Sequence, residues 1–229
     1  MTEDQNFQTY LTISENRFGI YLLEINTNKV LYEKEFCLGI NEKNDLNNLN
    51  YFLQENIFNI EKFIKKFVKN VNLIFQTKNI LDIKIGIKKK NFNTKYINKV
   101  LAEAKDLFNE NFQEYKIMHI ILNKTILDGK YYEKFVSSIE TSNLCIETRI
   151  ISVERKFISE LNNILERYQI RIISCTDEKY IRNFFGSNEI GIAQMAYRIL
   201  NGQNENEALI VPKNRKNQGF FEKFFQLFS

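Results

Sequence analysis

The sequence predicts an α/β protein in which a smaller α+β subdomain interrupts a larger one, with a short amphipathic helix at the end of the chain. Three observations predict this arrangement. Alternating apolar and polar residues, typical of strands, fill residues 10–36 and recur near residues 83–87 and 170–174. Apolar residues spaced by three or four positions, typical of helices, fill much of the intervening chain. Phenylalanine dominates the last eleven residues.

The composition excludes several classes of protein. The chain has 229 residues, of which 44% are hydrophobic and 26% charged, so it can bury a sizeable core and is neither disordered nor fibrous. Its net charge of +4 is too small to predict a duplex-binding surface. The three cysteines are widely spaced and there is one histidine, which predicts unpaired thiols in a reducing compartment and no metal site.

No signal peptide or transmembrane stretch is recognisable, so we expect the body of the chain to be cytoplasmic.

Residues 10–36 predict three strands in an antiparallel meander, because Phe18, Ile20 and Leu22 alternate with their neighbours and a polar turn follows at 26–28. A long helix is expected next. Its buried face would carry every third or fourth residue, namely Leu49, Leu53, Ile57, Ile60, Ile64, Phe67, Val71 and Ile74. Residues 83–87 then alternate as a fourth strand.

The next stretch predicts the inserted subdomain, residues 89–151. It contains a helix at about 94–109, a turn at Asp128-Gly129, and strands at 116–121, 125–127 and 145–151. The chain then returns to the larger subdomain, which we assign to residues 8–88 and 152–200. Its second part contains a strand at 170–174 and helices at 152–168, 177–185 and 188–200.

The end of the chain predicts membrane attachment. Residues 201–218 lack apolar periodicity and indicate a flexible linker. Residues 219–229 predict an amphipathic helix about 15 Å long, which would lie in the lipid interface and be too short to span a bilayer. The expected apolar contacts are Phe220, Phe221, Phe224, Phe225, Leu227 and Phe228, and the expected headgroup contacts are Lys213, Arg215, Lys216 and Lys223. The alternative is that this helix docks into a protein groove.

The motifs of enzymes are missing. No glycine-rich phosphate loop is present, and His119 lies in an apolar run typical of a packed side chain. We therefore expect no catalytic residue, no cofactor and no metal. The run Lys88-Lys89-Lys90, with Phe92 and Tyr96 nearby, indicates a solvated loop more than a contact for nucleic acid, so no nucleic-acid partner is predicted.

Several segments resemble FtsA, the actin-like protein of bacterial cell division. The stretch from His119 to Asp128-Gly129 is similar to the family's H-x-x-P-x-x-x-x-x-D-G strand pair, and residues 100–105 precede it like the family's v-L-e-A-A-k helix. Residues 147–174 are similar to the run leading to the family's next strand, and residues 190–197 to its closing helix. The tail resembles its membrane-targeting helix.

The resemblance implies one lobe of an actin-like (RNase H-like) fold. Residues 8–88 and 152–200 would form subdomain 1A, and residues 89–151 the inserted, SHS2-type subdomain 1C. The first phosphate loop would fall at 12–15, which lacks the family's Asp and Gly, and the chain passes from Phe185 to the closing helix without a second lobe. The resemblance therefore implies a reduced form that does not use ATP.

The predicted function is a non-catalytic division protein on the inner face of the cell membrane. Its tail would bind anionic lipid, and its 1C-like module would recruit or organise divisome proteins, with FtsZ among the candidates and self-association another. Two alternatives stay open: a scaffold of a pilus-assembly or cell-shape complex, and an actin-like ATPase completed by a partner.

Overall fold

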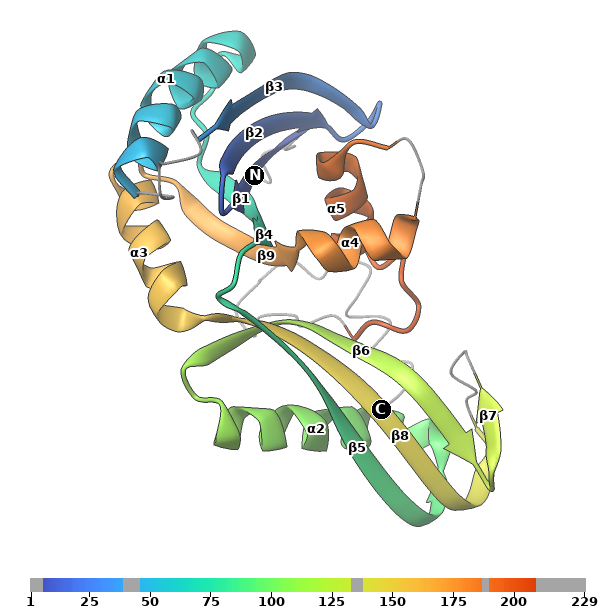
Figure 1. Ribbon diagram of the computed structural model, residues 1–229. Helices are drawn as coiled ribbons and strands as arrows, with labels where there is room; N and C mark the ends of the chain where they lie inside the picture. Colours follow the sequence, from blue (N-terminus) through green and yellow to red (C-terminus); the bar gives the residue numbers. More distant parts are fainter. Residues whose placement is uncertain (1–5, 39–45, 133–137, 187–189, 209–229) are drawn as a thin grey trace. The chain divides into compact units, whose positions relative to one another are not determined.

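The larger of two β-sheets is built from segments on both sides of the inserted stretch. The computed structural model describes residues 6–38, 46–132, 138–186 and 190–208. Within them, this sheet has the strand order β3-β2-β1-β4-β9 (Figure 1). The strands are β1 (Phe7–Ser14), β2 (Arg17–Glu24), β3 (Lys29–Cys37), β4 (Asn70–Gln76) and β9 (Arg171–Asp177).

Strand direction changes at β1. Strands β1, β2 and β3 pair antiparallel, which confirms the predicted meander. Strand β4 pairs parallel to β1 on one side and to β9 on the other. The carboxyl ends of β1, β4 and β9 therefore meet at one edge of the sheet, and their amino ends meet at the opposite edge.

Helices cover both faces of this sheet. The helices α1 (Leu46–Ile64) and α3 (Arg155–Glu166) lie on one face, and α4 (Glu178–Phe185) and α5 (Ile192–Leu200) on the other (Figure 1). The first layer packs α1 and α3 residues such as Leu53, Ile60 and Leu161 against Leu73 and Phe75 of β4. A parallel strand covered on both faces is apolar on both, and β4 fits this with Val71 and Leu73 to Phe75, interrupted by Asn72.

That run explains an error in the sequence-based prediction. The long helix was expected to include Phe67, Val71 and Ile74, but α1 ends at Ile64 and β4 follows. The apolar residues of a doubly buried strand happen to continue the helical spacing of α1, so periodicity alone cannot separate the two. Lys65 ends the helix with a left-handed backbone, φ 56°.

The second sheet has the order β5-β8-β6-β7. Its strands are β5 (Ile80–Asn93), β6 (Tyr115–Leu127), β7 (Lys130–Tyr132) and β8 (Glu140–Glu154), and α2 (Ile97–Asn111) packs on it after a short 3-10 turn (Thr94–Tyr96). The core between α2 and this sheet includes Ile87, Val100, Ala104, Leu144 and Ile146. Asp128 and Gly129 form the predicted turn, with φ of 46° and 82°.

The chain divides into two compact units. One comprises Met1–Asp82, Glu114–Met118 and Ile151–Asn204, and the other comprises Ile83–Gln113, His119–Ile150 and Glu205–Ser229. The strand expected at 83–87 is part of β5 and belongs to the second sheet, whereas the sequence assigned residues 8–88 to the larger subdomain. The strand at 83–87 was assigned to the larger subdomain because the sequence analysis did not identify β4, whose apolar residues continue the helical spacing of α1. The prediction of a mixed α/β protein is confirmed.

We predict that Leu73→Ala lowers the free energy of unfolding by about 2–5 kcal/mol, because it opens a cavity in a strand buried on both faces. Leu73 is 0% exposed. Leu31→Ala in β3 is the matched control, since Leu31 is 37% exposed, and should change stability by less than about 1 kcal/mol. Urea unfolding followed by circular dichroism measures both, and equal shifts of the two midpoints would contradict the placement of β4.

Candidate functional site

The residues predicted to bind the membrane all lie between Lys213 and Phe228, outside the described residues. Their contacts therefore stay a prediction from the sequence. Among the residues that the structure does describe, no helix combines the length and apolar character needed to cross a bilayer. The described chain ends at residue 208, so the segment just before it is the part that the structure can test.

That segment is hydrogen-bonded where a flexible linker was expected. Leu122 N–H donates to the carbonyl of Asn206, and Ala208 N–H donates to the carbonyl of Ile120, each at 2.8 Å. Through these bonds, residues 206–208 pair with β6, and an antiparallel bridge joins Ile121 and Glu207. The prediction of a linker starting at residue 201 is therefore wrong for this segment, and residues 209–218 lie outside the described part.

A buried polar pair fixes the same segment. The Nδ1 atom of His119 lies 2.6 Å from Oε1 of Glu207, and the two side chains are 2% and 5% exposed. Burying a polar group without a partner is costly, so this contact favours docking of Glu207 on β6. The sequence indicated a packed His119, and the structure confirms it. No local pattern in the sequence pointed to Glu207, whose partner His119 lies 88 positions earlier in the chain.

A second candidate site lies at the carboxyl ends of β1, β4 and β9, where ligands bind in open α/β sheets. A depression of about 560 Å³ opens there. It includes part of the segment 12–15 in which the resemblance placed a phosphate loop. Its lining comes from the β1–β2 turn, the segment after β4 and the start of α4: Ser14, Glu15, Asn16, Gln76, Thr77, Lys78, Ile80, Asp82, Asp177 and Lys179.

The chemistry of this depression is unfavourable to phosphates. Asp177 caps α4, its Oδ2 accepting a hydrogen bond from Tyr180 N–H at 3.1 Å and its Oδ1 one from Lys179 N–H at 3.3 Å. The backbone donors that would attract an anion at this helix start are thus already bound to a carboxylate. Three carboxylates and two lysines line the depression, and no glycine does. A phosphate chain would meet excess negative charge and no backbone cradle.

A partly buried ionic cluster joins β2, β3 and α4 around the buried Glu178. Oε1 of Glu178 lies 3.3 Å from an Arg17 guanidinium nitrogen and accepts a hydrogen bond from Arg182 Nε at 2.8 Å. Glu35 lies 3.2 Å from Arg17 and accepts a hydrogen bond from the Tyr21 hydroxyl. Glu178 itself is 1% exposed, and among the described residues its Oε2 has no hydrogen-bond partner.

These contacts shift two pKa values in directions that keep the cluster intact. Burial, followed by the hydrogen bond to Glu35, raises the pKa of Tyr21, so its phenol stays protonated. Burial alone would lower the pKa of Arg17. The charges of Glu35 and Glu178 have the larger effect, so the pKa of Arg17 is above its ordinary value. The cluster lies within one unit and joins elements of its sheet, which indicates a structural role.

The three cysteines differ in burial, and the basic run lies within a strand. Cys37 is exposed and Cys145 is partly buried, while burial raises the pKa of the Cys175 thiol to about 11 and keeps it protonated. Within the described residues, no group of histidine, cysteine, aspartate and glutamate could hold a metal ion. In the run Lys88–Lys90, which lies inside β5, the Lys89 ammonium is 2.6 Å from Glu103 of α2.

Comparison with known proteins identifies no relative by sequence. No family matches this chain, and no curated protein does. Solved structures similar to it include the cytoplasmic domain of EpsL, an inner membrane component of the type II secretion system of Vibrio cholerae, at 6% identity and a TM-score of 0.41. The chain's match covers 76% of its own residues and 58% of that domain.

Two others are a PilM–PilN type IV pilus biogenesis complex and a Bacteroides thetaiotaomicron protein of actin-like ATPase fold and unknown function. The first has 7% identity and a TM-score of 0.49, with coverage of 77% of this chain and 49% of that one. The second has 17% identity and a TM-score of 0.33, with coverage of 80% and 57%. The chain thus spans about half to three-fifths of these structures, and TM-scores below 0.5 assign neither its fold nor its function.

We predict that Glu178→Ala lowers the free energy of unfolding by about 1–3 kcal/mol, because two guanidinium groups lose the carboxylate between them. The expected loss is below that of a fully buried pair, since the side chains of Arg17 and Arg182 are 26% and 48% exposed. Glu33→Ala removes the same type of side chain from an exposed position in β3 and should be nearly neutral. Chemical unfolding of both variants measures this, and a neutral Glu178→Ala would contradict the structural role.

Proposed function

We propose that this chain is a non-catalytic scaffold that attaches to anionic membrane through residues 219–229 and presents its folded units to protein partners. The observation that carries the proposal is the phenylalanine pattern of the tail. Aromatic residues at 220, 221, 224, 225 and 228 repeat at helical spacing, and in a helix Glu222, Lys223 and Gln226 would face away from them. A pattern of this kind is typical of helices that lie in a lipid interface.

The energy of the tail suits reversible attachment. Partial burial of five phenylalanines and Leu227 contributes roughly 6 to 10 kcal/mol to membrane binding. Ordering of the helix opposes this, so the net binding free energy is a few kcal/mol. The basic residues Lys213, Arg215 and Lys216 would add attraction to anionic headgroups. One copy would bind and release, and several copies held together would stay bound.

The docking of residues 206–208 supports this arrangement. The last described residue is held on β6, so only residues 209–218 separate a folded unit from the helix. Ten residues reach at most about 35 Å. The folded unit would therefore stay close to the bilayer, where partners in the same membrane are concentrated.

An FtsA-like division role is the specific form of this proposal. The element order supports an actin-like lobe: β1, β2, β3, α1 and β4 come before the insertion, and α3, β9, α4 and α5 follow it. That is the order implied by the resemblance to FtsA, with the second unit in the place of its SHS2-type subdomain 1C. The protein would then act on the cytoplasmic face of the membrane and contact divisome proteins, or other copies of itself, through this unit.

The acidic lining of the carboxyl-end depression supports the non-catalytic part of the proposal. An actin-like ATPase completed by a partner is the rival, and it requires nucleotide binding. We expect calorimetric titration of the chain with ATP and Mg²⁺ to give no binding heat, because the helix start that would hold phosphate is occupied by Asp177. Micromolar binding would overturn this part and favour the rival.

We predict that the full chain sediments with vesicles of anionic lipid, while a chain ending at Gln218 and the double variant Phe221→Glu, Phe225→Glu stay in the supernatant. Two carboxylates on the apolar face would prevent insertion of the helix. The matched control, Gln226→Glu with Ser229→Glu, adds the same charges to the polar face and should keep most of the binding. If all four proteins stay in solution, the tail is not a membrane anchor.

The choice of membrane complex needs a separate experiment. Crosslinking in intact cells, followed by identification of the captured proteins, should recover division proteins if the FtsA-like role holds. Recovery of pilus-assembly or wall-elongation proteins, with no division proteins, would replace that role by the scaffold alternative and leave the membrane anchor in place.

A further inference from the structure

We propose that residues 62–69, where α1 ends and leads into β4, form a second contact with anionic lipid. We call this segment the α1–β4 turn. The inference rests on the proposed membrane attachment, but its observations come from described residues far from the tail in the sequence. It assigns a membrane-facing edge to the larger unit, in addition to the C-terminal helix.

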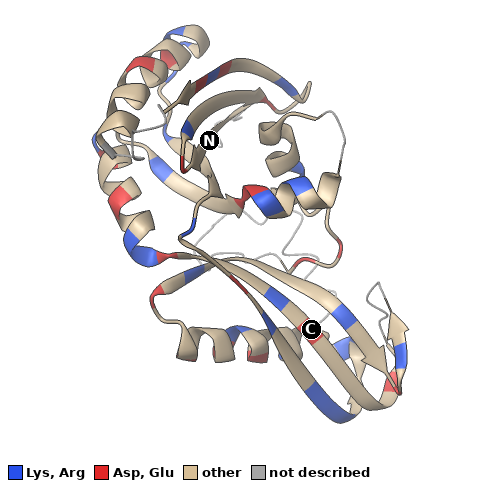
Figure 2. Ribbon diagram, viewed as in Figure 1, with Lys and Arg blue, Asp and Glu red and all other residues tan. Residues whose placement is uncertain are grey.

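The segment itself combines exposed aromatic and basic side chains and contains no acidic residue; the preceding Glu61 is partly buried, and its carboxylate accepts a hydrogen bond from Val68 N–H at 2.9 Å. Its sequence is Lys-Phe-Ile-Lys-Lys-Phe-Val-Lys. Phe63 is 58% exposed and Phe67 is 79% exposed. All four lysines, at positions 62, 65, 66 and 69, are exposed. Blue marks basic residues at the end of α1 that leads into β4 (Figure 2).

This exposure does not follow from the needs of the core. The buried face of α1 is supplied by Leu49, Leu53, Ile57 and Ile60, which pack against the sheet. Phe63 and Phe67 contribute little to it, yet each leaves most of an aromatic ring in water. Lys65 ends the helix with φ 56°, a conformation in which glycine or asparagine is favoured. A basic residue stands there at some cost in backbone energy.

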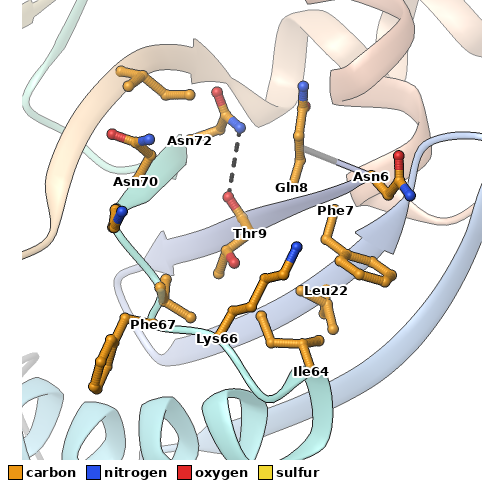
Figure 3. Close-up of a pocket in the computed structure, with 13 residues that line it drawn as sticks. Asn6, Phe7, Gln8, Thr9, Leu22, Ile64, Lys66, Phe67, Asn70 and Asn72 are labelled. Carbon is orange, nitrogen blue, oxygen red and sulfur yellow. Dashed lines mark hydrogen bonds between the residues drawn. The ribbon is translucent and has the colours of Figure 1, made fainter. Parts of the chain in front are cut away.

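A pocket of about 310 Å³ opens beside this turn, at the amino ends of β1 and β4 (Figure 3). Lys66, Phe67 and Lys69 line one side of it, and Asn6, Gln8 and Asn70 contribute polar groups from the strand side. In Figure 3 the Lys66 side chain extends toward Phe7, and the Gln8 side chain points away from it. An ammonium and several amides around an opening of this size suit the phosphate and polar groups of one lipid headgroup.

Charge and shape together favour a lipid surface. Exposed phenylalanines flanked by lysines are typical of interfacial segments, in which the rings enter the acyl boundary and the ammonium groups meet anionic headgroups. Arg171, whose backbone N–H donates to the Lys69 carbonyl at 2.9 Å, adds a further exposed positive charge next to the turn. A second contact on the same chain would bind at high local concentration once the tail is attached.

A single tryptophan can test this contact directly. The chain contains no tryptophan, so Phe67→Trp in the full-length protein makes the indole the only one present. We expect its emission to shift to the blue on addition of anionic vesicles and to be quenched by brominated lipid. Tyr51→Trp is the matched control: Tyr51 is also exposed, at 71%, but lies near the start of α1, and its emission should not change.

The outcomes separate this contact from the tail. If Phe67→Trp protein sediments with vesicles but its emission is unchanged, the tail binds and the second contact is overturned. If it neither sediments nor shifts, both proposals fall. If a single-stranded oligonucleotide changes the emission and vesicles do not, the turn is a nucleic-acid surface and the lipid contact is overturned.

The lysines supply an independent measurement. Lys65→Gln with Lys66→Gln should weaken vesicle affinity by about 25-fold, since each headgroup-facing lysine contributes roughly fivefold. The control, Lys78→Gln with Lys179→Gln, removes the same charge from exposed positions at the opposite edge of the sheet and should change affinity by less than about threefold. Equal losses in the two variants would show a general charge effect and overturn the assignment.

Discussion

Parallel pairing of β4 with β1 and β9 is the interaction on which the larger unit depends. Asn72 to Phe75 pair with Ser174 to Asp177, about a hundred residues further along the chain. The insertion between them can fold as its own unit because this pairing brings the two parts of the first unit together. Side chains of β4 are buried on both faces, with Leu73, Ile74 and Phe75 all 0% exposed. Loss of this strand would separate α1 and β1–β3 from α3, β9, α4 and α5.

The same pairing gives the two edges of the sheet different chemistry. Three parallel strands direct their carboxyl ends to one edge, where Asp177 caps α4 and carboxylates line the depression. Their amino ends lie at the other edge, where the α1–β4 turn places lysines and exposed phenylalanines beside a polar pocket. Buried polar contacts keep the strands in register between these edges. Ser174 donates a hydrogen bond to Asn72 at 2.6 Å, and Asn72 donates one to the carbonyl of Thr9 at 3.5 Å (Figure 3).

The sequence predicted most elements where one local signal dominated. Alternation in residues 10–36 was sufficient to predict the meander. The pair Asp128-Gly129 was sufficient to predict the turn between β6 and β7. Strand β4 was missed because Val71 and Ile74 continue the spacing of α1, and only pairing with β1 and β9 reveals it. Glu207 was missed because its role depends on His119, which is distant in sequence. The exposure of Phe63 and Phe67 could not be predicted, since phenylalanine at helical spacing usually indicates a core.

Hydrogen exchange with mass spectrometry on the full chain, with and without anionic vesicles, tests the central claim of membrane attachment most directly. The account predicts that vesicles slow exchange in residues 219–229 and in the α1–β4 turn. The loops at the carboxyl-end depression, residues 14–17 and 76–79, should exchange at unchanged rates. Unchanged exchange in residues 219–229 when vesicles are added would contradict the account.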